Sequence, residues 1–113
     1  MNLSKLIVPI EGGLYVMASK DCYKILKVLK VQEEIVHVRI YKNRYEKVPG
    51  RVDPSTLILR KIHDADGFGV GHQPTSQRAF TSWNAQFLQH SLVEPDELEG
   101  YNYWKEVGGG VWE

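Results

Sequence analysis

The stretch Tyr23–Tyr41, YKILKVLKVQEEIVHVRIY, decides the fold class. Its second half alternates: Val36, Val38 and Ile40 share one side, and the residues between them carry polar or aromatic groups. This period of two is typical of a strand with one buried face. Gln32–Glu34 supplies a hairpin turn, although it lacks the glycine that makes such a turn strong. A slip of one residue exposes all three aliphatic side chains, so the pairing is expected to be well specified.

The first half of this stretch fits two patterns. Lys24, Lys27 and Lys30 recur every three residues, and the apolar residues between them fit a helical stripe. The β-branched content, the length of about nine residues and the neighbouring strand favour a strand instead. On a regular strand Lys24 and Lys30 share one face, and Lys27 points to the other.

The flanking sequence predicts further elements on both sides of this hairpin. We expect strands at Leu14–Ser19 and Thr56–Ile62, and a loop between residues 43 and 54 marked by two proline turns. Pro74–His90 is expected to be helical at least in part, because three aromatic residues recur there at helical spacing. Thr75 or Ser76 is expected to cap this helix. A strand at Leu88–Val93 remains an alternative. Pro95–Lys105 is a second helix candidate, with proline and acidic residues suited to its first turn.

The charge of the chain is split, although the formal total is zero. Residues 1–63 contain twelve Lys and Arg against six Asp and Glu, whereas residues 64–113 contain two against eight. At 113 residues the chain fits one domain, in which residues 1–62 are mainly β and basic and residues 63–113 mainly helical, acidic and aromatic. The split indicates either a charged partner or pairing between the two halves.

A resemblance to a known fold rests on three segments: GLYV at residues 13–16, CYKILKV at 22–28 and VHVRIY at 36–41. Together they resemble the first three strands of SH3-like or Tudor-type small β-barrels. The resemblance implies binding of peptides or nucleic acids through aromatic residues near strand ends, here Tyr15, Tyr41 and Tyr45. With strands preceding helices, the expected fold is α+β: a strongly bent antiparallel sheet or SH3-like barrel followed by one or two C-terminal helices.

Motifs for catalysis, metals or cofactors are weak. No cysteine pair accompanies the four histidines, and the glycines of Gly67–Gly71 lack dinucleotide-binding spacing. We therefore expect no metal site, no cofactor and no catalytic residue, and we lean against an enzyme. A small enzyme using His72 with Asp64 or Asp66 is the remaining alternative. The roles of His63, His72 and the Gly67–Gly71 turn stay open. With one cysteine, Cys22, and no long apolar run, we expect a cytoplasmic protein without a membrane segment.

Two surfaces are candidates for binding. The acidic, aromatic C-terminal surface of Glu97, Tyr101, Tyr103 and Trp104 suits a basic protein partner, because aromatic rings anchor and charge speeds encounter. We interpret the chain first as a bacterial protein–protein interaction module, immunity- or inhibitor-like. The alternative is a module binding nucleic acid or peptide, in which the face comprises Arg39, Tyr41, Arg44 and Tyr45. The oligomeric state, including a homodimer, stays open.

Overall fold

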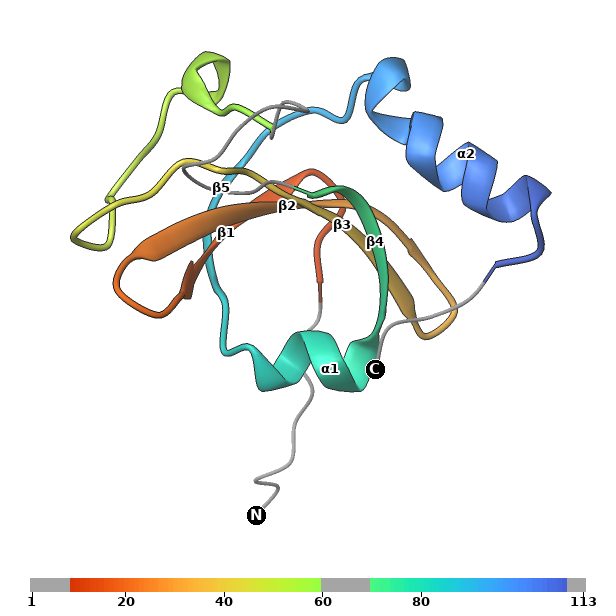
Figure 1. Cartoon of the computed structure of the whole chain (residues 1–113), viewed down its shortest axis with the longest axis horizontal. Helices are drawn as coiled ribbons and strands as arrows, with labels where there is room; N and C mark the ends of the chain where they lie inside the picture. The colour runs from red at the N-terminus through yellow and green to blue at the C-terminus, as the bar shows by residue number, and fades with distance from the viewer. Residues whose placement is uncertain (1–8, 60–69, 110–113) are drawn as a thin grey trace.

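The computed structural model describes residues 9–59 and 70–109, which form a bent five-stranded antiparallel sheet with short helices on both sides. The strands are β1 (Gly13–Ala18), β2 (Tyr23–Gln32), β3 (Ile35–Ile40), β4 (Val70–Ser76) and β5 (Gln86–His90). The helical elements are η1 (Pro54–Thr56), α1 (Gln77–Ser82), η2 (Pro95–Leu98) and α2 (Glu99–Glu106). Figure 1 shows α1 beneath the arch of the sheet and η1 and α2 above it.

The strand order is β4-β3-β2-β1-β5, and every neighbouring pair is antiparallel. β4 and β5 form the two edges, so the sheet is bent but not closed. This confirms the predicted α+β fold with a strongly bent sheet, in the open form rather than the barrel form. The expected strand at Leu14–Ser19 is β1, and the hairpin of Tyr23–Tyr41 is β2 and β3. β4 and β5 come after residue 63, so the second part of the chain also contributes strands.

The hairpin turns at Glu33 and Glu34, as predicted, with Glu33 in the left-handed region at φ 58°. The register is irregular between Val28 and Lys30. This bulge inserts one residue and changes which lysines share a face. Lys27 contacts Glu97, and the Lys30 ammonium lies 5.7 Å from the Tyr101 ring centroid. The expectation that Lys27 and Lys30 point to opposite faces is therefore wrong, because it assumed unbroken alternation.

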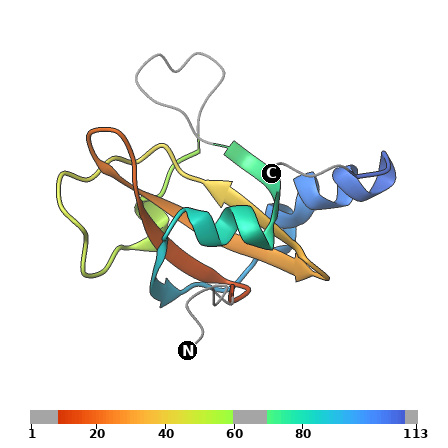
Figure 2. The same ribbon diagram turned by 90° about the horizontal axis from the view of Figure 1, so that it is seen from below.

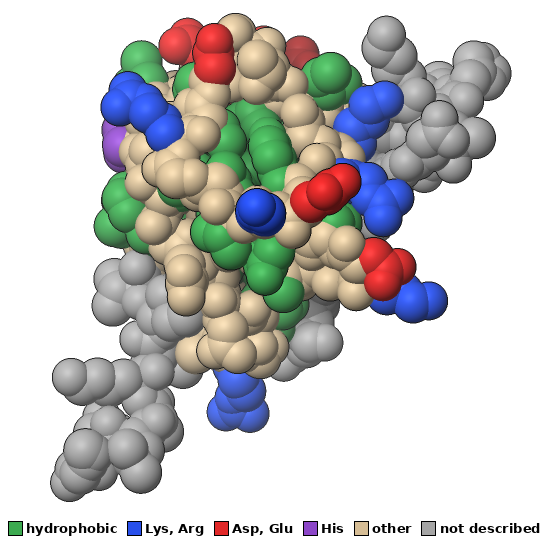
Figure 3. All heavy atoms as spheres, turned by 90° about the vertical axis from the view of Figure 1, so that its left-hand side faces the viewer, with side chains coloured by type: hydrophobic (Ala, Val, Ile, Leu, Met, Phe, Trp, Pro, Cys, Tyr) green, Lys and Arg blue, Asp and Glu red, His purple; other side chains and the backbone are tan. Residues whose placement is uncertain are grey.

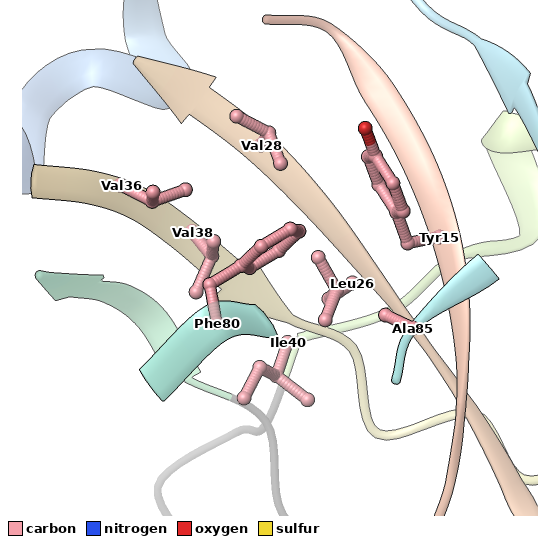
Figure 4. Packing of buried hydrophobic residues seen from close by; sticks show 8 residues of the cluster. All are labelled: Tyr15, Leu26, Val28, Val36, Val38, Ile40, Phe80 and Ala85. Carbon is pink, nitrogen blue, oxygen red and sulfur yellow. The ribbon is translucent and has the colours of Figure 1, made fainter. Parts of the chain in front are cut away.

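The main core lies on the inner side of the bend, where α1 closes it (Figure 2). The cluster consists of Tyr15, Leu26, Val28, Val36, Val38, Ile40, Phe80 and Ala85 (Figure 4). Phe80 comes from α1, is fully buried and meets Tyr15 edge to face at 5.4 Å. Its helix begins after Ser76, whose hydroxyl accepts a hydrogen bond from Ala79 N at 3.0 Å. One helical turn thus brings a large aromatic ring onto the three aliphatic side chains that face inward from β3.

A second cluster lies on the outer side of the sheet. It consists of Leu14, Val16, Ile25, Tyr41 and Val52, with the 42–59 segment packed over it. The amide side chain of Gln89 holds this segment to β5 by bonding both the N–H and the carbonyl of Val52, each at 2.9 Å. Both faces of the central strands are therefore covered.

Two predicted elements differ from the structure. Thr56 ends η1, residues 57–59 form no strand, and 60–62 lie outside the described residues. Asp53 causes this, because its carboxylate accepts from Ser55 N and caps a turn that Pro54 starts. In the Pro74–His90 segment only Gln77–Ser82 is helical. The chain reverses at Asn84, at φ 53°, and then pairs with β1. The strand β5 overlaps the expected Leu88–Val93 strand at residues 88–90.

Phe80 and Phe87 provide a matched test of the inner core. Phe80→Ala should lower the free energy of unfolding by about 3–5 kcal/mol, because it empties a fully buried ring site. Phe87→Ala should cost less than about 2 kcal/mol, because this ring, 49% exposed on β5, keeps much of its surface in water. Urea denaturation followed by far-UV circular dichroism measures both. Equal losses for the two variants would contradict this placement of the core.

Candidate functional site

The C-terminal helical segment is attached to the outer face of the sheet, and this attachment organises the candidate site. We refer to η2 and α2 together, residues 95–106, as the helical arm. Glu94 caps the arm through a reciprocal capping box with Glu97, in which Glu94 N donates to Glu97 Oε1 at 2.7 Å. Pro95 occupies the first turn, as its sequence position predicted. The helix predicted at Pro95–Lys105 is therefore confirmed, with its first turn of 3₁₀ type.

Glu97 joins the arm to the two central strands. Lys27 Nζ donates to both carboxylate oxygens, at 3.0 and 3.2 Å, and Arg39 Nη1 lies 3.6 Å from Oε2. Lys27 also donates to the carbonyl of Leu92 at 2.8 Å. The side chains of Lys27 and Glu97 are only 4% and 13% exposed. The carboxylate thus compensates two basic side chains that stand directly opposite each other in the β2–β3 pair.

A histidine pair lies beneath α2. His37 Nδ1 and His72 Nε2 are 2.9 Å apart, and the ring planes differ by 11°. At this distance one nitrogen donates a hydrogen and the other accepts it, so the two facing nitrogens share one hydrogen. His37 is fully buried, and its Nε2 has no hydrogen-bond partner among the described residues. Tyr101 and Trp104 of α2 meet the His37 ring edge to face, at 4.7 and 4.6 Å between centroids.

The surroundings keep this pair uncharged at neutral pH. Burial, together with charge repulsion from His72 and Lys30, lowers the pKa of His37 to about 4. Burial also lowers the pKa of His72, with a contribution from Arg39. Burial raises the pKa of Tyr41, at the other end of the same face, to about 12. The phenol of Tyr41 and both imidazoles are therefore neutral at pH 7.

Two further contacts fix the inner side of α2. The Tyr101 hydroxyl donates to Gln32 Oε1 at 2.6 Å. Gly100 lies directly against His72: a Cβ at position 100 would come within 2.5 Å of the His72 Cβ. The absence of a side chain at Gly100 therefore sets how closely α2 approaches β4.

The four residues predicted for the acidic, aromatic surface divide between the two sides of the arm. Glu97, Tyr101 and Trp104 lie on the inner side, in contacts with the sheet. Tyr103 is 66% exposed and lies on the outer side with the exposed Glu99 and Glu106. These three are separated by four and three residues, so they occupy one stripe of the helix. Sequence reasoning grouped the aromatic residues without assigning them to sides, and it missed the pairing of His37 with His72.

The four residues of the alternative basic face do not form one exposed surface. Arg39 lies against Glu97, and Tyr41 is buried in the outer cluster. Tyr45 is half-buried and pairs with Tyr23 through backbone hydrogen bonds of 2.8 and 3.0 Å. Only Arg44 of the four is exposed. Figure 3 shows the face around the β1–β2 turn and the 42–52 loop, where hydrophobic side chains gather with charged ones around and among them.

A polar hollow of about 420 Å³ lies where the start of the arm faces η1. Its lining includes both signs of charge: Lys27, Arg39, Tyr41, Ser55, Ser91, Asp96 and Glu97.

Among residues 9–59 and 70–109 no three His, Cys, Asp or Glu side chains are placed to hold a metal ion. Asp64 and Asp66, the expected partners of His72, lie outside the described residues, as do His63 and Gly67–Gly69. No helix in the described part of the chain is long and apolar enough to cross a membrane.

No protein-family model, no curated protein and no solved structure matches this chain. What the site can do is therefore inferred from its geometry.

Removing the Glu97 carboxylate should expose how the arm is attached. Glu97→Gln leaves Lys27 charged and buried, so the free energy of unfolding should fall by about 3–5 kcal/mol. The double variant Lys27→Met/Glu97→Leu should recover part of this loss, because it also removes the buried lysine charge, whereas Arg39 still lacks its carboxylate. Glu99→Gln on the exposed side is the control, with an effect below about 0.5 kcal/mol. Thermal and urea denaturation measure all three; a Glu97→Gln protein as stable as Glu99→Gln would refute the attachment.

Gly100→Ala tests whether position 100 lies against His72, because a free helix surface and a close contact predict opposite effects on the stability of α2. On a free helix surface this change should stabilise by about 1 kcal/mol through helix propensity. Here we expect the opposite, faster amide exchange over residues 101–106, because the new Cβ collides with His72. Asn102→Ala, at an exposed position of the same helix, should leave exchange unchanged or slower. Hydrogen–deuterium exchange with mass spectrometry distinguishes the two results.

Proposed function

We propose that this chain is a small binding protein that engages a basic surface of another protein through the outer side of its helical arm. The observation that carries this proposal is the exposed stripe of Glu99, Tyr103 and Glu106, which stands on a helix whose opposite side is fixed to the sheet. The exposed Asp96 extends the stripe toward η2.

The chemistry of the stripe suits a cationic partner. Tyr103 offers a large ring with a polar tip, the type of side chain that anchors protein interfaces. The carboxylates around it would speed encounter with a basic surface. The nearby cation, Lys105, has its ammonium 5.5 Å from the Tyr101 ring centroid, on the inner side of the helix. The stripe therefore presents negative charge together with one aromatic ring.

The rigid attachment of the arm favours this use. Glu97 and Tyr101 hold the two helical elements in place through their bonds to Lys27 and Gln32. A surface that is already ordered loses less conformational entropy on binding. In this proposal Glu97, Tyr101 and Trp104 support the binding surface from behind, and Tyr103 makes the contact.

An inhibitor is the form of this function that we favour, in the manner of bacterial immunity proteins that neutralise nuclease toxins. Nucleases carry basic surfaces because they bind phosphate backbones, and an acidic stripe with an aromatic anchor complements such a surface. We place the encounter in the cytoplasm, where a free thiol such as that of Cys22 stays reduced.

Site-specific photo-crosslinking can test the proposal in the host cell. A photoreactive phenylalanine at position 103 should crosslink to a protein with a basic surface, whereas the same group at Val48, 51% exposed on the 42–52 loop, should not crosslink to it. With the purified partner, Tyr103→Ala should weaken affinity about 10-fold or more. Glu99→Lys should slow association most at low salt.

The control for these variants is Arg44→Glu, which changes an exposed charge on the 42–52 loop. It should leave affinity for the partner within about 2-fold, a difference below about 0.5 kcal/mol. Crosslinks that form equally from positions 103 and 48, or a partner whose affinity does not respond to Tyr103→Ala and Glu99→Lys, would reject the outer side of the arm as the binding surface.

A further inference from the structure

We propose that the His37–His72 pair is a proton-operated latch for α2: the helix stays on the sheet while the pair is uncharged and leaves when His37 takes up a proton. The release of α2 follows from the contacts beneath it. Only its consequence for a partner rests on the proposed function.

The hydrogen-bond arrangement of the pair leaves no favourable place on His37 for another proton. One hydrogen already lies between His37 Nδ1 and His72 Nε2, which are 2.9 Å apart. A second hydrogen there would put two N–H groups against each other. The other ring nitrogen, His37 Nε2, is buried without an acceptor among the described residues. A proton on that atom would be a buried charge without a hydrogen bond, which is costly.

The charged groups around the pair add to this cost. β2 contributes Lys30 and β3 contributes Arg39, and their positive charges act on His37 and His72 respectively. α2 contributes the ammonium of Lys105. The ammonium groups of Lys30 and Lys105 both lie within 6 Å of the centroid of the Tyr101 ring, which itself contacts His37.

The carboxylates of the arm do not offset this positive charge. Glu97 is engaged by Lys27 and Arg39, whereas Glu99 and Glu106 are exposed on the outer side of the arm. A charged pair would therefore face cations without a carboxylate contact among the described residues.

The direction of the pH effect follows from the two states of the helix. With α2 docked the pKa of His37 is lowered to about 4, whereas a solvent-exposed histidine has a pKa near 6.5. The contribution of this histidine to docking is therefore fully present above about pH 6.5. As the pH falls toward 4, the docking equilibrium constant should fall by up to about 10-fold per pH unit for each proton taken up. The lowered pKa of His72 acts in the same direction.

Undocking would also disrupt the outer stripe, because α2 would lose its helical structure. α2 has eight residues, and a helix of this length is only marginally stable in water without tertiary contacts. Once released, it would no longer hold Glu99, Tyr103 and Glu106 in one line. If the outer side binds a basic partner as proposed, acidification would release that partner.

NMR of the full chain tests the latch without any partner. From about pH 7.5 to about pH 4.5, the amides of residues 99–106 should move to random-coil positions in one transition, together with the ring signals of His37 and His72. Amides of β1, β2 and β3 should keep their folded positions. His37→Phe/His72→Phe should keep α2 docked over the same range, because both positions then carry a ring without a titrating nitrogen. His90→Phe, at an exposed histidine of β5, is the matched control and should show the wild-type transition.

A helix that stays docked at about pH 4.5, well below the ordinary histidine pKa, would overturn the latch. A double variant that releases α2 at the wild-type pH would also overturn the latch, since groups other than the two histidines would then cause the release. Loss of the folded β1–β3 signals in the same transition would show global unfolding and would contradict a transition confined to α2. If the double variant does not fold, His72→Gln, which removes one titrating ring, should make the α2 transition shallower. An unchanged slope in that variant would contradict the latch. Crosslinking from position 103 at neutral pH is independent of all these results.

Discussion

The carboxylate of Glu97 lies between two basic residues, Lys27 and Arg39, that stand opposite each other in the central hairpin. Without a counter-charge at this position, a largely buried lysine and arginine would face each other on the same side of the sheet. The arm supplies the counter-charge from 58 to 70 positions further along the chain. The opposite charges of the two halves of the sequence are thus paired, in part, inside the molecule. Because a buried ion pair adds little net stability, we interpret this one mainly as fixing where the arm docks.

The central hairpin was predictable because its signals are local. Alternation of aliphatic residues sets the faces of β3, and the turn at Glu33 follows from the polar break between two apolar runs. The failures came from features that alternation does not encode. The bulge after Val28 moves Lys30 to the face of Lys27. Phe87 extends a helical spacing that began at Phe80, but the chain had already reversed at Asn84 to pair with β1.

The sequence predicted the types of residue in the candidate site, but not how they are arranged. Carboxylates interleaved with aromatic rings predicted a binding surface, but most of these side chains face inward to the sheet. Which side of a helix faces inward depends on where the helix docks, and the docking depends on partners distant in sequence. The histidine pair shows this most clearly, because His37 and His72 are 35 residues apart. Neither position carries a local motif. The role of Gly100, likewise, became visible only from its contact with His72.

The arm combines two kinds of attachment that respond differently to conditions. The Glu97 contacts require charge, whereas the buried position of His37 beneath α2 favours its neutral form. Near neutral pH both conditions are met, so the arm is held at both ends. In acid, a charged His37 would loosen α2, whereas the contacts that hold η2 through Glu97 do not involve the histidines. The exposed stripe with Tyr103 stands on the part of the arm that depends on neutral histidines. A binding surface built there is therefore tied to the protonation of the sheet beneath it.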